Sequence, residues 1–448
     1  MKHNNFKKVV TELGSAGNIA VTVALATVPM VLLAGAAVDL GRVYYVRSEL
    51  SKALDAATLS VASSSLTDTS TLNYRLQDLF TANYHLSNIA TPTTPTMTIS
   101  GNIVDSSVST TVQMTLLAPL IPSMTVSVTS EVSKQTSGIE LVMVLDTTGS
   151  MSSNNKMPQL KVAAHNLITQ LFGSSSSSSS VSVGIVPFTD TVNIGRSNTS
   201  YVDQSGFVGL DWGTTSWGGC VMAPNSSHDQ DDAFYSTKGA WLPYYWPSDQ
   251  NNYWKRVTTS HGKTTTTYTI NSTQGPNYQC NAYPIVPLTN QRAPLDAAID
   301  ALQPAGSTHI NVGLAWGWYT ISPNYPFTEG QPYDSTKIKK YIVLMTDGQN
   351  TIQTFSAYGN LSQGKLGTTN ATAAVTELYR RQKIVCDNIK ALGVTIFTVA
   401  LEVTDATSNA ALSDCATPPG RYFSATSSNI TDVFNTIGGQ ISKVRLTK

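Results

Sequence analysis

The stretch that decides the fold is IELVMVLDTTGS, residues 139–150. Its first part is apolar apart from Glu140, which is typical of a strand covered on both faces of a parallel sheet. In an open α/β sheet, ligands bind beyond the carboxyl ends of the strands. We therefore expect the carboxylate of Asp146 and the hydroxyls of Thr148 and Ser150 at a binding edge. This all-oxygen set suits a hard cation such as Mg²⁺.

Two further segments offer oxygen atoms in matching positions. One is a Gly-Ser-Thr-His turn before a segment with helical periodicity, and the other is an Asp-Gly pair directly after an apolar run. If the strands are parallel, both reach the same sheet edge. One loop cannot fill an octahedral coordination shell, so these segments complete the predicted site. We predict a site for Mg²⁺, or for another divalent cation such as Ca²⁺ or Mn²⁺, at Asp146, Thr148, Ser150, Thr308 and Asp347.

Strands and helices alternate after residue 138. Such alternation indicates an open, mostly parallel α/β sheet with helices on both faces. A small β-rich segment, predicted from alternating β-branched residues between Met97 and Val132, precedes it. Apolar runs and helical periodicity predict strands at 139–145, 181–188, 340–345 and 394–403, and helices at 157–172, 294–302, 311–319, 371–392 and 430–444.

Residues from about 189 to 292 interrupt this alternation. The segment is rich in Trp, Tyr, Ser, Thr and Asn, and it contains Cys220 and Cys280. We interpret it as a long, disulfide-linked insertion at the end of a strand, where α/β proteins place specificity. An aromatic insertion beside a metal is expected to contact a ligand or partner, and a surface loop without such a role is the alternative. A second insertion is predicted at 349–369.

Three motifs in this order resemble the metal-ion-dependent adhesion site of von Willebrand factor A domains. They are Asp-x-Thr-x-Ser after the first strand, Gly-Ser-Thr before a helix, and a strand that ends in Thr-Asp-Gly. The resemblance implies direct metal ligation by Thr148, Ser150 and Thr308, and ligation partly through water by Asp146 and Asp347. The family usually has Ser where this chain has Thr148, and the added methyl group crowds the site. A domain without a metal is the alternative.

A run of apolar and small residues extends from Ile19 to Val38 and is long enough to cross a bilayer as a helix. Its interpretations are an uncleaved anchor, a cleaved signal peptide and a buried core helix. The length of the run and the basic residues beside it favour the anchor. Lys and Arg are balanced on the two sides, so charge leaves the orientation open. The four cysteines are expected to form disulfides, which persist outside the reducing cytoplasm. This places the short tail inside and the large body outside the cytoplasm.

The N-terminal segment carries a second resemblance. The motifs GN at 17–18, AVD at 37–39 and LDAA at 54–57, with Arg42 between them, resemble the TadE/TadG-like proteins of bacterial tight-adherence (Flp) pilus systems. In larger members this segment is joined to a von Willebrand A-like domain. The resemblance implies a single-pass inner-membrane protein whose large domain lies in the periplasm or outside the cell. Its implied partners are other pilus or secretion components, or a surface protein ligand.

We predict the following division of the chain. It comprises a cytoplasmic tail at 1–17, a transmembrane helix and helical stalk at 18–62, a small β-rich segment and linker at 63–137, and a von Willebrand A-like domain at 138–448 with the insertion at about 189–292.

Composition supports an exported protein. The 448 residues are 41% hydrophobic and only 12% charged, with zero net charge. This balance does not indicate nucleic acid as a partner, because phosphate binding needs a basic field. Four cysteines allow three pairings, of which the local one, Cys220–Cys280 and Cys386–Cys415, is preferred over the other pairings and over buried free thiols. Their spacing does not indicate zinc.

No hydrolase, metalloprotease or phosphate-loop motif occurs, so we do not expect an enzyme. His309 is expected beside the metal ligands or in solvent. The acidic cluster Asp229, Asp231 and Asp232 is interpreted as a solvated loop rather than a Ca²⁺ site.

Two functions are therefore compared. The preferred one is a membrane-anchored pilus-assembly or adhesion component that binds a partner through a divalent metal. The alternative is a metal-independent structural module of a cell-envelope assembly. An enzyme-associated subunit is disfavoured by the membrane segment and by the absence of an ATPase motif.

Overall fold

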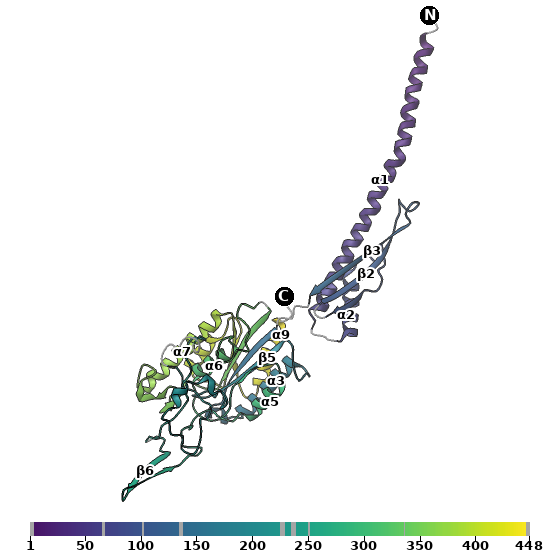
Figure 1. Ribbon diagram of the computed structural model, residues 1–448. Helices are drawn as coiled ribbons and strands as arrows, with labels where there is room; N and C mark the ends of the chain where they lie inside the picture. The colour runs from purple at the N-terminus through teal and green to yellow at the C-terminus, as the bar shows by residue number, and fades with distance from the viewer. Residues whose placement is uncertain are drawn as a thin grey trace. The chain divides into compact units, whose positions relative to one another are not determined.

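A computed structural model describes residues 4–64, 68–100, 103–133, 138–224, 229–233, 239–249, 251–335 and 337–444 (Figure 1). The chain forms two compact units, Met1–Thr136 with Leu446–Lys448 and Ser137–Arg445. Each unit has its own hydrophobic core, and each is described by itself below.

The N-terminal unit consists of a long helix, a short helix and a three-stranded antiparallel sheet. Apolar residues alternate along the second and third strands, and their buried side chains pack against the C-terminal half of the long helix. The predicted β-rich segment is thereby confirmed. The elements are α1 (Asn4–Ala62), α2 (Thr69–Asn83), β1 (Thr96–Ser100), β2 (Ile103–Gln113) and β3 (Ser123–Ser133), with the strand order β1-β2-β3.

Helix α1 has two halves with different surroundings. From Val46 to Ala62 one apolar face of the helix is buried in the core of the unit, while Leu59 on another face is exposed. Between Val23 and Leu40, by contrast, large apolar side chains are exposed, for example Leu33 at 71%. Among the described residues, α1 is the one helix long and apolar enough to cross a membrane. Exposed apolar residues over this length are typical of a helix surrounded by lipid.

The C-terminal unit contains a six-stranded sheet in the order β13-β12-β9-β4-β5-β8. All neighbouring strands are parallel except the pair β5–β8. The predicted open, mostly parallel sheet is confirmed, with an additional antiparallel edge strand that falls inside the predicted insertion. The strands are β4 (Gly138–Asp146), β5 (Val181–Phe188), β8 (Val286–Thr289), β9 (Ile338–Thr346), β12 (Thr395–Leu401) and β13 (Tyr422–Ala425).

Helices cover both faces of this sheet (Figure 1). Odd-numbered β4 residues such as Leu141 face one helical layer, and even-numbered ones such as Val142 face the other, as the two-residue period of a strand requires. One layer contains α3 (Lys156–Phe172), α5 (Arg292–Ala301) and α9 (Ile430–Val444), and the other contains α6 (Ile310–Ile321), α7 (Ala371–Ala391) and α8 (Ala406–Cys415).

The charged interruption of the central strand has a buried partner. Glu140 on β4 forms an ion pair with Lys340 on the neighbouring strand β9, and both side chains are at most 5% exposed. Lys340 also donates to the carbonyl of Ile321 at 2.8 Å. Burial nevertheless lowers the pKa of Lys340. The pair therefore joins the two strands and the end of α6 at the amino edge of the sheet.

The long insertion covers the outer side of α6. Trp241 of the insertion lies with its ring centroid 5.0 Å from that of Trp316 and 5.5 Å from that of Tyr319. An exposed hairpin of β6 (Lys255–Ser260) and β7 (Lys263–Tyr268) projects from it (Figure 1). The predicted disulfides are both present, Cys220–Cys280 within the insertion and Cys386–Cys415 between α7 and α8. Because the insertion covers one side of α6 and the sheet covers the other, all twelve residues of this helix are buried.

Two glycines let α6 lie directly on the sheet. A Cβ on Gly313 would overlap the ring of Phe188, and a Cβ on Gly317 would overlap the side chain of Val144. The two glycines are one helical turn apart and therefore face the same strands. The absence of side chains at these positions sets the separation between the helix and the sheet.

We predict that Gly313→Ala destabilises the C-terminal unit by about 1–3 kcal/mol, since the added methyl group forces the helix away from Phe188. Gly439→Ala in α9 is the matched control, because its Cβ would meet the nearest atom, Nε2 of Gln170, at 3.8 Å. All seven tryptophans lie in the C-terminal unit, so chemical unfolding of the full chain followed by Trp fluorescence reports on it. Equal midpoints for the two variants would contradict the prediction.

Candidate functional site

The structure brings together oxygen atoms from two predicted segments at the carboxyl edge of the sheet. Thr148 and Ser150 lie in the loop after β4, and their hydroxyl oxygens are 3.0 Å apart. The Ser150 hydroxyl donates to Oδ1 of Asp347, which follows β9, at 2.6 Å. These strands are adjacent and parallel. Residues almost 200 positions apart in sequence therefore meet because their strands end at the same level.

The turn that contains Thr308 lies against this loop. The N–H of Gly149 donates to the carbonyl of Gly306 at 3.0 Å, and the N–H of Ala305 donates to the carbonyl of Thr147 at 2.8 Å. Thr308 is 4% exposed, and within the part of the chain described its hydroxyl has no hydrogen-bond partner. All three predicted segments thus meet at one edge, and the Thr308 hydroxyl oxygen still has its hydrogen-bonding and ligating capacity.

Asp146 is fully buried and satisfied by local hydrogen bonds. Its Oδ1 accepts from the N–H of Thr148 at 2.8 Å, and its Oδ2 accepts from the hydroxyl of Thr346 at 2.6 Å. Burial raises the pKa of Asp146, and the neighbouring charge of Asp347 raises that pKa further. A cation at this edge would offset both effects.

A lysine that sequence reasoning missed already offsets part of this charge. Lys156, in the first turn of α3, donates to Oδ2 of Asp347 at 2.9 Å, and its side chain is only 8% exposed. Glu402 lies 3.9 Å from the same ammonium group. The predicted set of oxygen ligands contains no basic residue, so it did not indicate Lys156. A basic residue at the start of the helix after the metal loop is the signal that could have revealed it.

The oxygen atoms suit a hard cation. Adjacent ligands of an octahedral Mg²⁺ with metal–oxygen distances of about 2.1 Å lie about 3 Å apart. The separation of 3.0 Å between the hydroxyl oxygens of Thr148 and Ser150, two of the predicted direct ligands, matches this spacing. Without a cation, the same oxygens satisfy one another through hydrogen bonds. The described residues contain no group of three or more His, Cys, Asp or Glu side chains that could hold a metal, so a cation here depends on hydroxyl oxygens and water.

Asp190 is a third buried carboxylate at this edge, and the sequence analysis did not select it. It follows β5, the other neighbour of β4, and its Oδ1 lies 3.4 Å from the position that a Cβ on Gly306 would take. Neither carboxylate oxygen has a hydrogen-bond partner among the described residues. Burial raises the pKa of Asp190 to about 7. The rule that selected Asp146 and Asp347, an acidic residue just after an apolar strand, would have found it.

Both insertions contact the site. The Asn281 side-chain amide, in the long insertion, donates to the carbonyl of Pro187 at 3.0 Å and lies 3.5 Å from the hydroxyl of Thr147. In the second insertion, the Thr351 hydroxyl accepts from the N–H of Thr308 at 3.0 Å. The insertions therefore help to position the loops that carry the candidate ligands.

The acidic cluster at 229–232 is not a solvated loop, and our interpretation of it was wrong for Asp229. This residue is 5% exposed and forms an ion pair of 2.8 Å with Arg381 of α7. Arg381 is 1% exposed and also pairs with Glu377 at 2.8 Å. The interpretation failed because the partner is 152 positions away in sequence. The ion pair of Asp229 with Arg381 therefore links the long insertion to α7.

His309 is also not in solvent. It is fully buried, and its ring centroid lies 5.8 Å from that of Tyr358. Burial lowers the pKa of His309 to about 3, so the ring is neutral at ordinary pH. It belongs to the packing beneath the second insertion.

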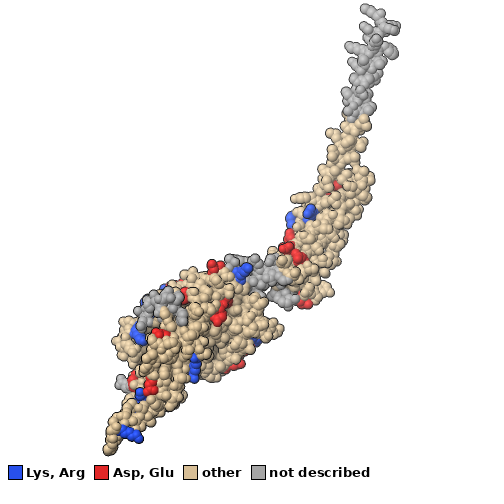
Figure 2. Space-filling model, in the orientation of Figure 1, with Lys and Arg blue, Asp and Glu red and all other residues tan. Residues whose placement is uncertain are grey.

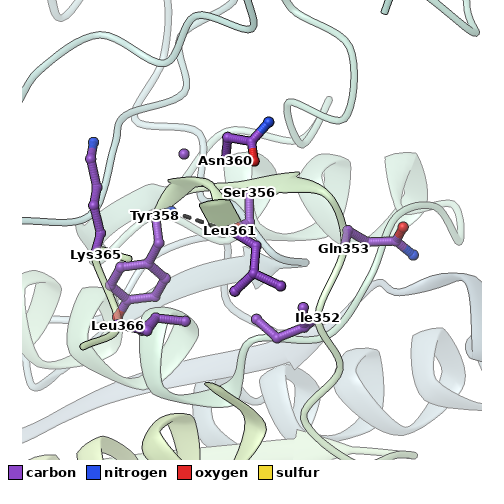
Figure 3. A pocket seen from close by; sticks show the side chains of 9 residues that line it. Ile352, Gln353, Ser356, Tyr358, Asn360, Leu361, Lys365 and Leu366 are labelled. Carbon is purple, nitrogen blue, oxygen red and sulfur yellow. Dashed lines mark hydrogen bonds between the residues drawn. The ribbon is translucent and has the colours of Figure 1, made fainter. Parts of the chain in front are cut away.

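A small pocket in the second insertion does not extend the site. Figure 3 shows its lining side chains, with Tyr358, Leu361 and Leu366 facing a narrow space. The enclosed volume is about 10 Å³, which is room for at most one water molecule. A ligand of any size therefore has to bind elsewhere.

Comparisons with known proteins give one match to a family model. Residues 17–64 match the family described as putative Flp pilus-assembly TadE/G-like, which confirms the resemblance predicted for the N-terminal segment. A search of curated proteins finds no match.

Several solved structures are similar to the chain. The von Willebrand factor domain of the type V pili tip protein Mfa5 from Porphyromonas gingivalis shares 12% identity at a TM-score of 0.39, over 70% of this chain and 97% of that one. The pilus adhesin SpaC from Lactobacillus rhamnosus GG shares 12% identity at a TM-score of 0.37, over 78% of this chain and 34% of that one. Proximal thread matrix protein 1 from the mussel byssus, with a zinc-occupied MIDAS motif, shares 13% identity at a TM-score of 0.32, over 70% of this chain and 46% of that one. At these scores, the similarities do not assign a function to this chain.

We predict that Asp190→Asn reduces the pH dependence of stability. A carboxyl group with a raised pKa in the folded state stabilises fully below its unfolded value of 3.8, and this contribution is lost as pH rises towards about 7. The variant should therefore match the parent near pH 4 and be more stable by about 2–4 kcal/mol at pH 8. Unfolding midpoints from Trp fluorescence across this range provide the measurement. Asp334→Asn, at an exposed position, is the control for loss of a charge, and equal pH profiles for the parent and Asp190→Asn would refute the prediction.

Proposed function

We propose that the chain is a membrane-anchored component of a pilus-assembly or adhesion system that binds a partner through a divalent cation at the carboxyl edge of its α/β sheet. The observation that carries the proposal is the convergence of the Thr148, Ser150 and Asp347 oxygens beside the Thr308 turn. The cation in this proposal is Mg²⁺, with Ca²⁺ and Mn²⁺ as the other candidates.

The N-terminal unit supports the cellular context. The match at residues 17–64 relates this segment to pilus assembly, and the same residues include the exposed apolar part of α1. Two disulfides in the C-terminal unit support a location outside the reducing cytoplasm. We infer a single-pass protein of the bacterial inner membrane whose C-terminal unit lies in the periplasm or outside the cell. Its partners would be pilus or secretion components, or a surface protein ligand.

The residues of the edge divide into two roles in this proposal. Thr148, Ser150 and Thr308 would hold the cation directly, and Asp146 and Asp347 would hold its water ligands. A bound cation would supply an open coordination position for an acidic group of a partner. Asp146 also fixes the loop through its hydrogen bond to the N–H of Thr148, so it supports the ligand geometry whether or not a cation is present.

A metal-independent structural module is the second candidate, and one observation favours it. The ammonium group of Lys156 already pairs with Asp347, and Asp347 also accepts a hydrogen bond from Ser150. The carboxylate of Asp347 is thus satisfied by the chain itself. In that case the unit would contribute to a cell-envelope assembly through its surface, and chelators would leave its function unchanged.

We predict that Lys156→Met increases the affinity for Mn²⁺, used as a paramagnetic substitute for Mg²⁺. Loss of a positive charge a few ångströms away should strengthen binding roughly three- to thirtyfold, while the Met side chain preserves the packing of the Lys stem. Titration of the full chain in detergent, followed by electron paramagnetic resonance of free Mn²⁺, measures the affinity. Lys161→Met, in the same helix with its ammonium on the carbonyl of Asp300, is the matched control. No Mn²⁺ binding to parent or variant at millimolar concentration would favour the metal-independent module.

We also predict that Asp146→Ala weakens Mn²⁺ binding by more than tenfold and reduces the number of pili. The variant loses both a site carboxylate and the hydrogen bond that fixes the loop. Pili counted by electron microscopy on cells that assemble them with this chain give the cellular readout, and Asp334→Ala controls for loss of an acidic residue. Normal pili in cells that express Asp146→Ala at parental level would argue against a role of the cation in assembly.

A further inference from the structure

The loop between β2 and β3, residues 114–122, forms an apolar tip of the N-terminal unit. Its sequence MTLLAPLIP contains no charged residue. Three of its large side chains are exposed, Leu116 at 52%, Leu120 at 68% and Ile121 at 46%. Figure 2 shows little Lys, Arg, Asp or Glu over the corresponding end of the N-terminal unit. Grouped exposed apolar side chains indicate a surface that is covered by something other than water.

The loop is fastened to helix α1 by a buried carboxylate. Asp39 accepts hydrogen bonds from the N–H groups of Thr115 at 3.1 Å, Leu116 at 2.8 Å and Leu117 at 2.7 Å. The guanidinium group of Arg42 donates to the hydroxyl of Thr115. These bonds fix the start of the loop on one face of the helix, at the residue that ends the apolar run.

The next turn of α1 places the loop beside the apolar run itself. Leu116 packs on Gly35, where an added Cβ would lie 2.9 Å from the Leu116 Cβ. Gly35 is one turn before Asp39, about 6 Å further along the helix towards the apolar end. Neighbouring residues on the other faces, such as Leu33 and Val38, remain exposed at 71% and 55%. The exposed residues of the loop and of the helix therefore form one continuous apolar surface.

Most backbone N–H groups of the loop are satisfied within the N-terminal unit. Besides the N–H groups bound by Asp39, the N–H of Met114 donates to the carbonyl of Pro122 at 3.0 Å, and those of Leu120 and Ile121 donate to the carbonyl of Leu117 at 2.9 and 2.8 Å. Pro119 and Pro122 have no N–H. Within the described loop, only the N–H of Ala118 lacks a partner. Satisfied N–H groups lower the cost of placing this non-helical segment at the membrane interface, where its remaining carbonyls can still bind water or headgroups.

We propose that the loop 114–122 inserts into the membrane leaflet nearest the folded domain, with lipid acyl chains covering Leu116, Leu120 and Ile121. The proposal rests on the membrane anchoring of α1 in the proposed function. Arg42 lies on the side of Asp39 away from the apolar run, where it meets lipid headgroups. Insertion is shallow, about 5–10 Å, as for interfacial segments. Lipid is favoured over a second protein because the exposed surface of the loop continues that of the membrane helix.

The experiment uses thiol-reactive NBD dye on single-cysteine variants of the full chain in phosphatidylcholine–phosphatidylglycerol vesicles. The described cysteines are all in disulfides, so the dye reports the introduced residue. Leu120→Cys tests the loop, and Val28→Cys, at an exposed position of α1, tests the anchor. Ile99→Cys is the matched control. It is 37% exposed and pairs with Val104 near the start of β2, about 30 Å from the loop at about 3.3 Å per strand residue.

We expect lipids that carry a spin label near the headgroup to quench the dye at residue 120 at least twofold, and to leave the dye at residue 99 unquenched. Ile121→Cys repeats the test in case Leu120→Cys folds poorly. Quenching at residue 28 with none at 120 or 121 would overturn the insertion and leave the anchor intact. The dye at residue 28, near the middle of the apolar run, is read with lipids that carry the spin label deep in the acyl chain, and no quenching there would overturn the anchor and the insertion with it. A dye at residue 120 that is shielded from water but quenched only by a spin-labelled second copy of the chain would assign the loop to a protein interface instead.

Discussion

The sheet edge depends on the burial of two carboxylates, Asp146 and Asp347, at the ends of neighbouring parallel strands. They are 0% and 6% exposed, and a buried carboxylate is costly unless hydrogen bonds or an opposite charge compensate it. The N–H of Thr148, the hydroxyls of Thr346 and Ser150, and the ammonium of Lys156 provide this compensation. The path of the loop after β4 follows from these bonds, since each of them requires a particular backbone position.

The two ends of β4 solve the same electrostatic problem in different ways. At the amino end, Glu140 forms a buried ion pair with Lys340, and that lysine also donates to a backbone carbonyl. At the carboxyl end, Lys156 pairs with Asp347, whereas Asp146 is held only by the N–H of Thr148 and the hydroxyl of Thr346. A closed ion pair stabilises strand pairing, whereas an excess of oxygen acceptors leaves room for an additional cation. The contrast is consistent with the proposal that a ligand binds at the carboxyl end of the strand.

Local patterns were sufficient to predict the parallel sheet and the segments of its edge. The signal for each strand, an apolar run that ends in Asp146 or Asp347, is contained in a few neighbouring residues. The topology of a parallel sheet then brings the ends of these strands together. The partners at long range could not be predicted in this way. Lys156 approaches Asp347 only once α3 has packed under the edge, and Arg381 approaches Asp229 only once the insertion has folded onto α7. Periodicity records the environment of a residue, and it does not identify the individual partner.

The insertions connect this edge to a much larger surface. Asn281 reaches the loop after β4 from the long insertion, and Thr351 and Thr308 exchange hydrogen bonds between the second insertion and the turn before α6. The long insertion is in turn held by a disulfide and by the buried pair of Asp229 with Arg381. A partner that contacts the insertions would therefore act on groups hydrogen-bonded to the candidate ligands. Coupling of this kind requires that the partner distinguish two arrangements of the edge. In the proposed function these would be the Ser150 hydroxyl bonded to Asp347, as in the structure, and the same hydroxyl bound to the cation.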